Sequence, residues 1–272
     1  MMIDILKSLC YEVYEQTKLL AGTLEGSRRI SLGAGGDISR KIDLVAESSV
    51  IDRIKKSGFS PTIIGEECGR IMGLDQDSYL VMDAIDGTTN AIRGIPFYCC
   101  SLAYATDYKL SSVSEAAIID LTNGDLYHAE KGKGAFMNNE QISAVSQRGY
   151  ISRQSEQDDG LLVGMNLSGA SVDMILRLSK IIHNSKHSRH FGANALELCY
   201  LARGFTDAYI DVRDKIRPTD MAAGYLIVKE SGGNVYSIDG HELDSVLEVT
   251  ATMSYFAVAN DSVFKILTKN LI

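Results

Sequence analysis

Residues 80–90 read LVMDAIDGTTN, and this stretch decides how the fold is interpreted. The apolar run at 80–82 predicts a short buried strand that delivers Asp83 to its carboxyl end. Asp86 then falls in a turn, and Gly87 with the two threonines after it can open a helix. Ligands commonly bind at strand ends in open α/β sheets, and a helix amino terminus offers unpaired N–H groups to a phosphate. The stretch therefore predicts a ligand site at a strand end.

Glu66 and Glu67 precede this stretch and add two more carboxylates. Carboxylates gathered at one point repel one another unless a cation joins them, and hard oxygen ligands suit Mg²⁺. Two metal ions supply the positioning and the charge neutralisation that phosphoryl transfer needs. Taken alone, the pattern also fits a surface turn at Asp86 and Gly87 beside solvated charge, or a phosphotransfer site with an aspartate nucleophile.

The rest of the chain predicts helices and strands in alternation. Helices are predicted at 3–21, 43–58, 171–184, 194–204 and 221–233, and from Asp261 to the end. Strands are predicted at 61–67, 79–86, 98–107, in a hairpin at 116–130, and at 131–142, 161–167, 207–212, 234–238 and 256–260. The Gly-rich, charged residues 27–41 predict a mobile loop, and the polar residues 147–160 mark a candidate boundary. Strands interleaved with helices predict a mixed, layered α/β architecture.

The composition limits the class of protein. A chain of 272 residues suffices for one large domain or two tightly joined halves. The net charge of −8 argues against a nucleic-acid partner, because such partners are bound mainly through clustered Lys and Arg. No apolar run is long enough to span a bilayer, and the first residues carry acids among their apolar positions, so a cytoplasmic protein is expected. Five widely spaced cysteines predict neither a disulfide framework nor a zinc site.

Several motifs occur in a fixed order along the chain: GEE at 65–67, DAIDGTTN at 83–90, TDMAAG at 219–224 and ESGG at 230–233. In this order they closely resemble the inositol monophosphatase and fructose-1,6-bisphosphatase superfamily. Within it, the sequence looks most like the archaeal-type enzymes that act on both substrates. The resemblance extends over nearly the whole chain, and several motifs in a fixed order form a far stronger signal than one.

The resemblance implies a fold and an activity. The expected fold is α/β, an alternating αβαβα sandwich with mixed sheets. An α+β amino-terminal half, residues 1–145, would carry the metal site, and an α/β half, residues 146–272, would bind substrate. The implied enzyme is a Mg²⁺-dependent phosphatase that hydrolyses fructose 1,6-bisphosphate, inositol 1-phosphate or both by attack of an activated water. A homodimer is also implied.

The metal ligands carry over to matching positions. The resemblance implies that Glu66, Asp83 and the Ile85 carbonyl hold one Mg²⁺, and that Asp83, Asp86 and Asp220 hold a second. Glu66 would share a third, weaker ion through waters, so two or three ions per site are expected. Asp83 alone would bridge both tightly held ions.

The catalytic and substrate-binding roles carry over in the same way. Asp43 and Thr88 would orient and deprotonate the attacking water, with Glu66 as a third catalytic residue. The amides of Gly87 and Thr88 would receive the phosphate. The sugar hydroxyls would be met by Asp211 and by the helix opening at Gly192, Ala193 and Asn194.

Two positions depart from the family pattern. Ala84 stands where the family usually has Pro, and the turn there loses a fixed φ. Thr219 replaces the usual Trp before the last aspartate. Neither replaced residue is a ligand, so the chemistry is expected to survive.

A basic segment precedes Asp220, with Arg213, Lys215 and Arg217 at alternating positions. Alternation in an extended segment puts all three on one side. One interpretation is that Arg213 or Arg217 grips a second phosphate, which favours the bisphosphate substrate. The other is a solvated loop whose charges pair with neighbouring aspartates such as Asp211.

Two other functions stay open at this point. A nucleotide 3′-phosphate is an alternative substrate, although no aromatic pair is placed to stack a base. A regulatory binding role is the second alternative, since some members of the superfamily act in transcription complexes. The intact ligand set argues against it, because a pure binding module would not need one.

Overall fold

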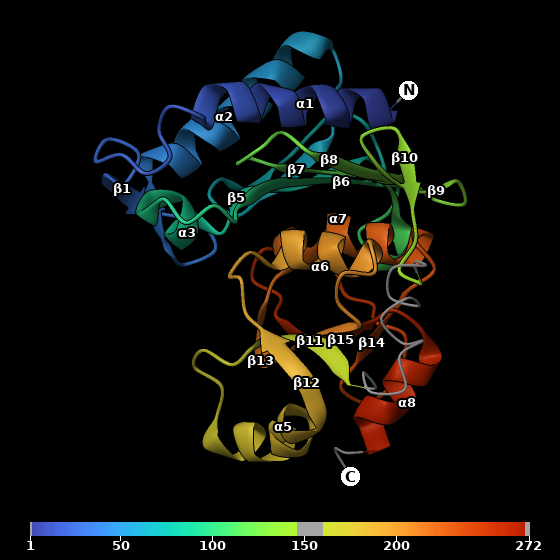
Figure 1. Cartoon of the computed structure of the whole chain (residues 1–272). Helices are drawn as coiled ribbons and strands as arrows, with labels where there is room; N and C mark the ends of the chain where they lie inside the picture. The colour runs from blue at the N-terminus through green and yellow to red at the C-terminus, as the bar shows by residue number, and fades with distance from the viewer. Residues whose placement is uncertain (1, 146–159, 270–272) are drawn as a thin grey trace.

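The computed structural model of the chain describes residues 2–145 and 160–269, and its elements stack in five alternating layers (Figure 1). One outer layer holds α1 (Met2–Thr17) and α2 (Lys41–Ser57). The middle layer, between the two sheets, holds α6 (Asn194–Ala202) and α7 (Pro218–Glu230). The other outer layer holds α5 (Val172–Asn184) and α8 (Asp261–Lys269). The predicted αβαβα sandwich is confirmed.

The larger sheet has eight strands in the order β10-β9-β8-β7-β6-β5-β3-β4. Their bounds are β3 (Thr62–Gly65), β4 (Gly69–Ile71), β5 (Tyr79–Asp86), β6 (Cys99–Ala105), β7 (Val113–Asp120), β8 (Leu126–Glu130), β9 (Gly134–Met137) and β10 (Glu140–Ile142). A 3-10 turn, Leu110–Ser112, leads into β7. Only β3 and β5 pair in parallel within this sheet, and its other pairs are antiparallel.

The smaller sheet has five strands in the order β12-β11-β13-β15-β14. Their bounds are β11 (Leu161–Asn166), β12 (Ser185–Arg189), β13 (Ala208–Ile216), β14 (Asn234–Ser237) and β15 (Met253–Val258). The first three run parallel, and β15 is antiparallel to both of its neighbours. Both sheets are therefore mixed, as expected.

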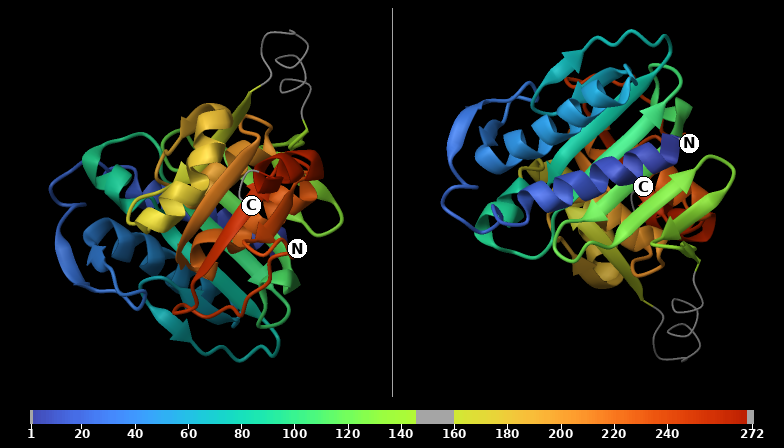
Figure 2. Two further views of the ribbon diagram at one scale, coloured as in Figure 1. Left: turned by 90° about the horizontal axis from the view of Figure 1, so that it is seen from below. Right: turned by 90° about the horizontal axis from the view of Figure 1, so that it is seen from above.

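Strand β5 contains a continuous apolar run, residues 80–82, because both faces of the sheet are covered there. Helix α2 packs on one side of β5 and α7 on the other, and residues 80–86 are all buried. Strands buried on both faces read as continuous apolar runs and do not alternate. The run that suggested a strand from sequence is thus explained by the two helical layers, of which the outer one, with α1 and α2, is seen in the right view of Figure 2.

The middle helices tie the two predicted halves together. Leu196 of α6 and Ile227 of α7 belong to one buried cluster with Val81 and Ile118 of the larger sheet. Elements from the second half therefore bury their apolar sides on a sheet from the first half. The predicted boundary at 147–160 falls almost wholly outside the described residues, and the division into halves stays a prediction.

Residues 27–41 form a hairpin, and the prediction of a loop there was wrong. Strands β1 (Arg29–Leu32) and β2 (Ile38–Arg40) pair antiparallel as a two-stranded sheet. The glycine-rich turn between them is held from outside, because the Ala34 and Gly35 amides donate to the carbonyls of Glu67 and Glu66. These long-range partners are invisible to local sequence patterns.

Candidate active site

A cavity of about 570 Å³ opens where the hairpin, the larger sheet and the middle helices meet. Its walls are the end of β5, the start of α3 (Thr88–Arg93), the starts of α6 and α7, and the end of β13. The predicted site residues that line it are Asp43, Glu66, Asp83, Ile85, Asp86, Gly87, Thr88, Gly192, Ala193, Asn194, Arg213, Arg217 and Asp220. Of the predicted set, only Asp211 does not line it.

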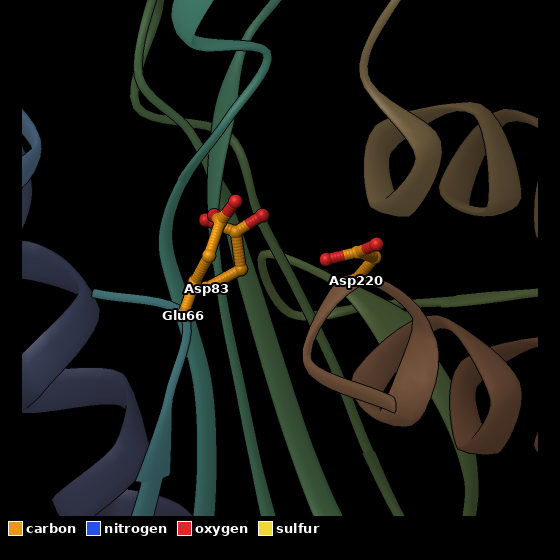
Figure 3. Close-up of side chains that lie close together, drawn as sticks. All are labelled: Glu66, Asp83 and Asp220. Carbon is orange, nitrogen blue, oxygen red and sulfur yellow. The ribbon is translucent and has the colours of Figure 1, made fainter. Parts of the chain in front are cut away.

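Three carboxylates converge at the back of this cavity. Glu66, Asp83 and Asp220 each offer an oxygen, and these oxygens all lie within 4.8 Å of one another. Because β3 and β5 are parallel and Gly65 pairs with Met82, the next residues, Glu66 and Asp83, lie side by side where β3 ends. Figure 3 shows Glu66 and Asp83 together there, with Asp220 facing them from the start of α7.

Backbone amides at two helix starts hold Asp220 and one further carboxylate, Asp43. Asp43 and Asp220 are each the third residue of a helix, and each accepts a hydrogen bond from the amide of the residue capping that helix. The distances are 2.7 Å from the Arg40 amide to Asp43 and 2.9 Å from the Arg217 amide to Asp220. An acid at this position also suits the positive end of the helix dipole.

Asp86 joins the two predicted halves. The pairing of β5 with β6 shifts between Asp83 and Asp86, so a bulge turns Asp86 into the cavity. Its Oδ2 accepts a hydrogen bond of 2.6 Å from the amide of Ala195 at the start of α6. Asp83 in turn accepts from the Ile85 amide at 3.0 Å.

Burial and mutual repulsion raise the pKa values of these acids. Burial raises the pKa of Glu66 to about 8, and Asp220 adds to the effect. Burial also raises the pKa of Asp86 to about 7, with Asp220 again contributing. The pKa of Asp83 lies well above its usual range because it is buried beside Glu66 and Asp86. A divalent cation bound between these oxygens would relieve the repulsion.

The donor set fits a hard divalent ion. All candidate ligands are carboxylate or carbonyl oxygens, the type that Mg²⁺ and Mn²⁺ prefer, whereas zinc sites use Cys and His. Thr219 adds a contact that the usual Trp would not make, since its hydroxyl donates to Asp220 Oδ1 at 3.0 Å. The residues present therefore fit a metal centre.

Asp43 and Thr88 form the predicted pair at the side of the metal set. The Thr88 hydroxyl lies 3.0 Å from Asp43 Oδ1 and 3.1 Å from the Ile85 carbonyl, so it can donate to either. Burial raises the pKa of Asp43 to about 6. Gly87 has a φ of 91° and a Cβ there would lie 3.0 Å from Ala193, so the turn needs glycine.

The basic segment lines the cavity, but its arginines are engaged by acids. Arg213 makes three hydrogen bonds to Asp211, which is fully buried beneath it. Arg217 pairs with Glu66 and Asp220. Lys215 also lines the cavity, and no carboxylate partner of Lys215 occurs among the described residues. Asp211 thus holds Arg213 in place, and its expected contact with sugar hydroxyls stays a prediction.

The Asn194 side chain also makes hydrogen bonds within the protein. Its side chain donates to the Asp220 carbonyl at 2.8 Å and accepts from the Tyr255 hydroxyl. It therefore anchors α6 to α7 and the smaller sheet. The start of α6, with Gly192 and Ala193, still faces the cavity.

Two buried acids were missed by sequence reasoning. Glu47 lies one turn after Asp43 on α2, and its carboxylate accepts from the Glu67 amide at 3.2 Å. Glu197 of α6 accepts from the amides of Phe191 and Gly192. Burial raises the pKa of each acid to about 7. In both helices, an acid on an otherwise apolar face was the sequence feature that could have revealed these residues. Both residues hold turns that carry site residues.

Comparison with known proteins places this geometry among phosphatases. Residues 9–268 match the profile of the inositol monophosphatase family. A fructose-1,6-bisphosphatase/inositol-1-monophosphatase of Methanothermobacter thermautotrophicus is 36% identical over 89% of this chain and 86% of its own length. A bifunctional NADP phosphatase/NAD kinase of Methanococcus maripaludis is 31% identical over 93% of this chain, which corresponds to 46% of that protein.

A solved structure is also similar to this chain in both sequence and fold. A Pyrococcus horikoshii protein, described as having similarities to inositol-1 monophosphatase, superposes with a TM-score of 0.79. It is 30% identical, and the match covers 97% of this chain and 95% of the other.

Proposed function

The chain belongs to the inositol monophosphatase family, a family of phosphatases, and on that premise we propose that it hydrolyses small sugar or cyclitol phosphates with Mg²⁺. The observation that carries the proposal is the convergence of the Glu66, Asp83 and Asp220 oxygens within 4.8 Å. Fructose 1,6-bisphosphate and inositol 1-phosphate are the proposed substrates. Two ions in the site, held by these residues with Asp86 and the Ile85 carbonyl, would neutralise the phosphoryl charge and activate the attacking water.

Thr88 and Asp43 would accept the proton that the attacking water releases. A water placed beside Thr88 would donate to its hydroxyl oxygen, while the hydroxyl passes its own proton to Asp43 Oδ1, 3.0 Å away. With a pKa of about 6, Asp43 is ionised at neutral pH and still basic enough to accept a proton. The Gly87 and Thr88 amides would receive the phosphoryl oxygens.

The test is phosphate release from both substrates with Mg²⁺ and with EDTA. We expect release only with the metal, and loss of release in Asp83→Asn. Release that persists in EDTA would contradict the metal scheme. Trapping of a phosphorylated Asp83 or Asp86 would instead establish the aspartate-nucleophile alternative, because direct attack by water leaves no covalent intermediate.

A distal phosphate has two cations available in the cavity. Arg213 is held in place by Asp211, and Lys215 has no carboxylate partner among the described residues, whereas Arg217 is occupied by Glu66. We therefore propose that Arg213 and Lys215, not Arg217, favour the bisphosphate. A charge-assisted hydrogen bond contributes about 1.5–3 kcal/mol, or roughly tenfold to a hundredfold in binding.

Substrate preference is measured as kcat/KM for the two substrates in wild type and Lys215→Ala. We expect the variant to lose at least about tenfold on fructose 1,6-bisphosphate and little on inositol 1-phosphate. Equal losses on both would show that the segment is no selector. Arg213→Ala is a weaker test, since it leaves Asp211 buried without a partner.

The NADP phosphatase relative favours a second candidate substrate. That protein matches 93% of this chain at 31% identity, so the 2′-phosphate of NADP belongs in the same panel. Tyr209 is the one aromatic side chain among the described residues that line the cavity, which leaves no pair to stack a base. We expect NADP to be hydrolysed more slowly than the sugar phosphates, and a higher kcat/KM for NADP would reverse the ranking.

The proposal extends to the oligomeric state of the protein and to its relation to membranes. We propose a homodimer, as the family resemblance implies, and its measured mass would be twice the 29.7 kDa of one chain. None of the helices within residues 2–145 and 160–269 has the length and apolar character needed to cross a bilayer. A regulatory binding role would become the better conclusion if no sugar, cyclitol or nucleotide phosphate were hydrolysed.

A further inference from the structure

Arg217 places a cation directly on the proposed metal ligands. It caps the start of α7, and its Nη2 lies 2.5 Å from Glu66 Oε1. Its Nε lies 3.5 Å from Asp220 Oδ1, and its Nη1 lies 3.3 Å from Asp37 Oδ2. Nη1 also donates to the Gly35 carbonyl at 3.1 Å. One guanidinium thus touches two proposed ligands and the tip of the hairpin.

Neighbouring residues enclose the Arg217 guanidinium closely. The Arg217 side chain is only 15% exposed. A Cβ at Gly35 would lie 2.2 Å from Nη1, so a larger residue there would displace the group. Its Nε–H is buried and makes no hydrogen bond to any residue that the structure describes, although it faces Asp220. The group is therefore held firmly by Glu66 and the hairpin, and more loosely by Asp220.

We propose that Arg217 is a built-in cation that competes with the divalent metal ion for Glu66 and Asp220. The proposal rests on the metal site of the proposed function. A guanidinium and a divalent ion on the same carboxylates repel each other, so metal entry requires Arg217 to leave both acids. Once the guanidinium has left these acids, it can remain bound to Asp37 and to the Gly35 carbonyl, which belong to the hairpin.

Two consequences follow for the protein. Arg217 lowers the affinity for metal, and it stabilises the acid cluster when metal is scarce. It also links the hairpin to the occupancy of the site, since a guanidinium that has left Glu66 and Asp220 is held by Asp37 and Gly35 alone. The same residue is then removed from any direct role in gripping a distal phosphate.

The test is calorimetric titration of Mn²⁺ into wild type, Arg217→Met and Arg217→Gln, with melting in EDTA as a second readout. Lys215→Met is the matched control, because Lys215 lines the same cavity with the same charge but makes no ion pair with Glu66 or Asp220. We expect Mn²⁺ to bind at least about tenfold more tightly to the Arg217 variants and within about threefold of wild type to the control. The Arg217 variants should also melt at a lower temperature in EDTA.

Each outcome of the titration supports or overturns competition between Arg217 and the metal ion. Equal or weaker binding in Arg217→Gln would show that the residue orients Glu66 for the metal, which overturns competition. An equal gain in Lys215→Met would reduce the effect to charge acting through space, and would also overturn it. If no variant and no wild-type protein binds the ion, the metal site fails, and the proposed function fails with it. Arg217→Gln keeps a polar side chain and serves where the methionine variant does not fold.

Discussion

Replacing Asp86 by asparagine should stabilise the protein in the absence of metal while destroying its activity. In the folded chain, burial and the nearby Asp220 raise the pKa of Asp86 from 3.8 to about 7. One unit of pKa corresponds to about 1.4 kcal/mol, so ionised Asp86 disfavours the native state by on the order of 4 kcal/mol at pH 8. Asparagine removes the charge and keeps an oxygen that can accept from the Ala195 amide. We expect a gain of about 2 to 4 kcal/mol in EDTA at pH 8.

The pH dependence has a defined sign. The pKa is raised in the folded state, so the folded protein binds more protons than the unfolded chain between about pH 4 and pH 7. The contribution of Asp86 to stability is therefore fully present near pH 4 and is lost as the pH rises through about 7. Asp86→Asn lacks this loss, and the two proteins should have similar stability at the acid end.

The assay is urea denaturation in EDTA at several pH values, repeated at saturating Mg²⁺. Metal should reverse the order, because wild type gains binding free energy that the variant, with one ligand missing, does not. Asp239→Asn is the control, since Asp239 is exposed and its loss should change stability by less than about 0.5 kcal/mol. A variant no more stable than wild type in EDTA at pH 8 would refute the reasoning.

The other predictions concern activity. Asp83→Asn should lower kcat on the order of thousands-fold, because Asp83 would be a ligand of the metal ions, and steady-state phosphate release measures this. Thr88→Ala should lower kcat less, since Asp43 can take a proton from water without the hydroxyl, and an equal or greater loss would place the threonine at the centre of the chemistry. Activity should fall as the pH drops through about 6, where Asp43 takes up a proton, and Asp43→Asn should have low activity without this acidic limb. An unchanged limb in that variant would assign the titration to another group.

Much of the site could be predicted because its first part lies in one short segment. The apolar run at 80–82, the acids at Asp83 and Asp86 and the glycine at Gly87 stand within eight residues, so local geometry places them near the end of one strand. The predicted turn at Asp86 was wrong, because Asp86 is the last residue of β5 and a bulge against β6 turns it into the cavity. A buried strand and a helix start are both dictated by residue type over that distance. Asp43 and Asp220 were named through the family resemblance, and the structure places both at helix starts.

The layered order of the elements was also predictable, since helices and strands alternate with recognisable periods. The hairpin at 27–41 was not, because its turn is held by the backbone of Glu66 and Glu67 and not by residues within it. Glu47 and Glu197 escaped notice for a related reason. Each supports a turn in another segment, and nothing in its own helix indicates that partner.

The sequence by itself, through the family resemblance, indicated which residues would carry the chemistry and which local element presents each of them. Only the tertiary structure decided which charges face one another. Arg217 meets Glu66 from 151 positions away, and Asp211 is buried under Arg213 instead of facing the cavity. Periodicity defines the buried face of each element, but the charge opposite that face depends on how α6 and α7 pack between the two sheets. Coulomb interactions follow distance in space, which the order of residues along the chain does not contain.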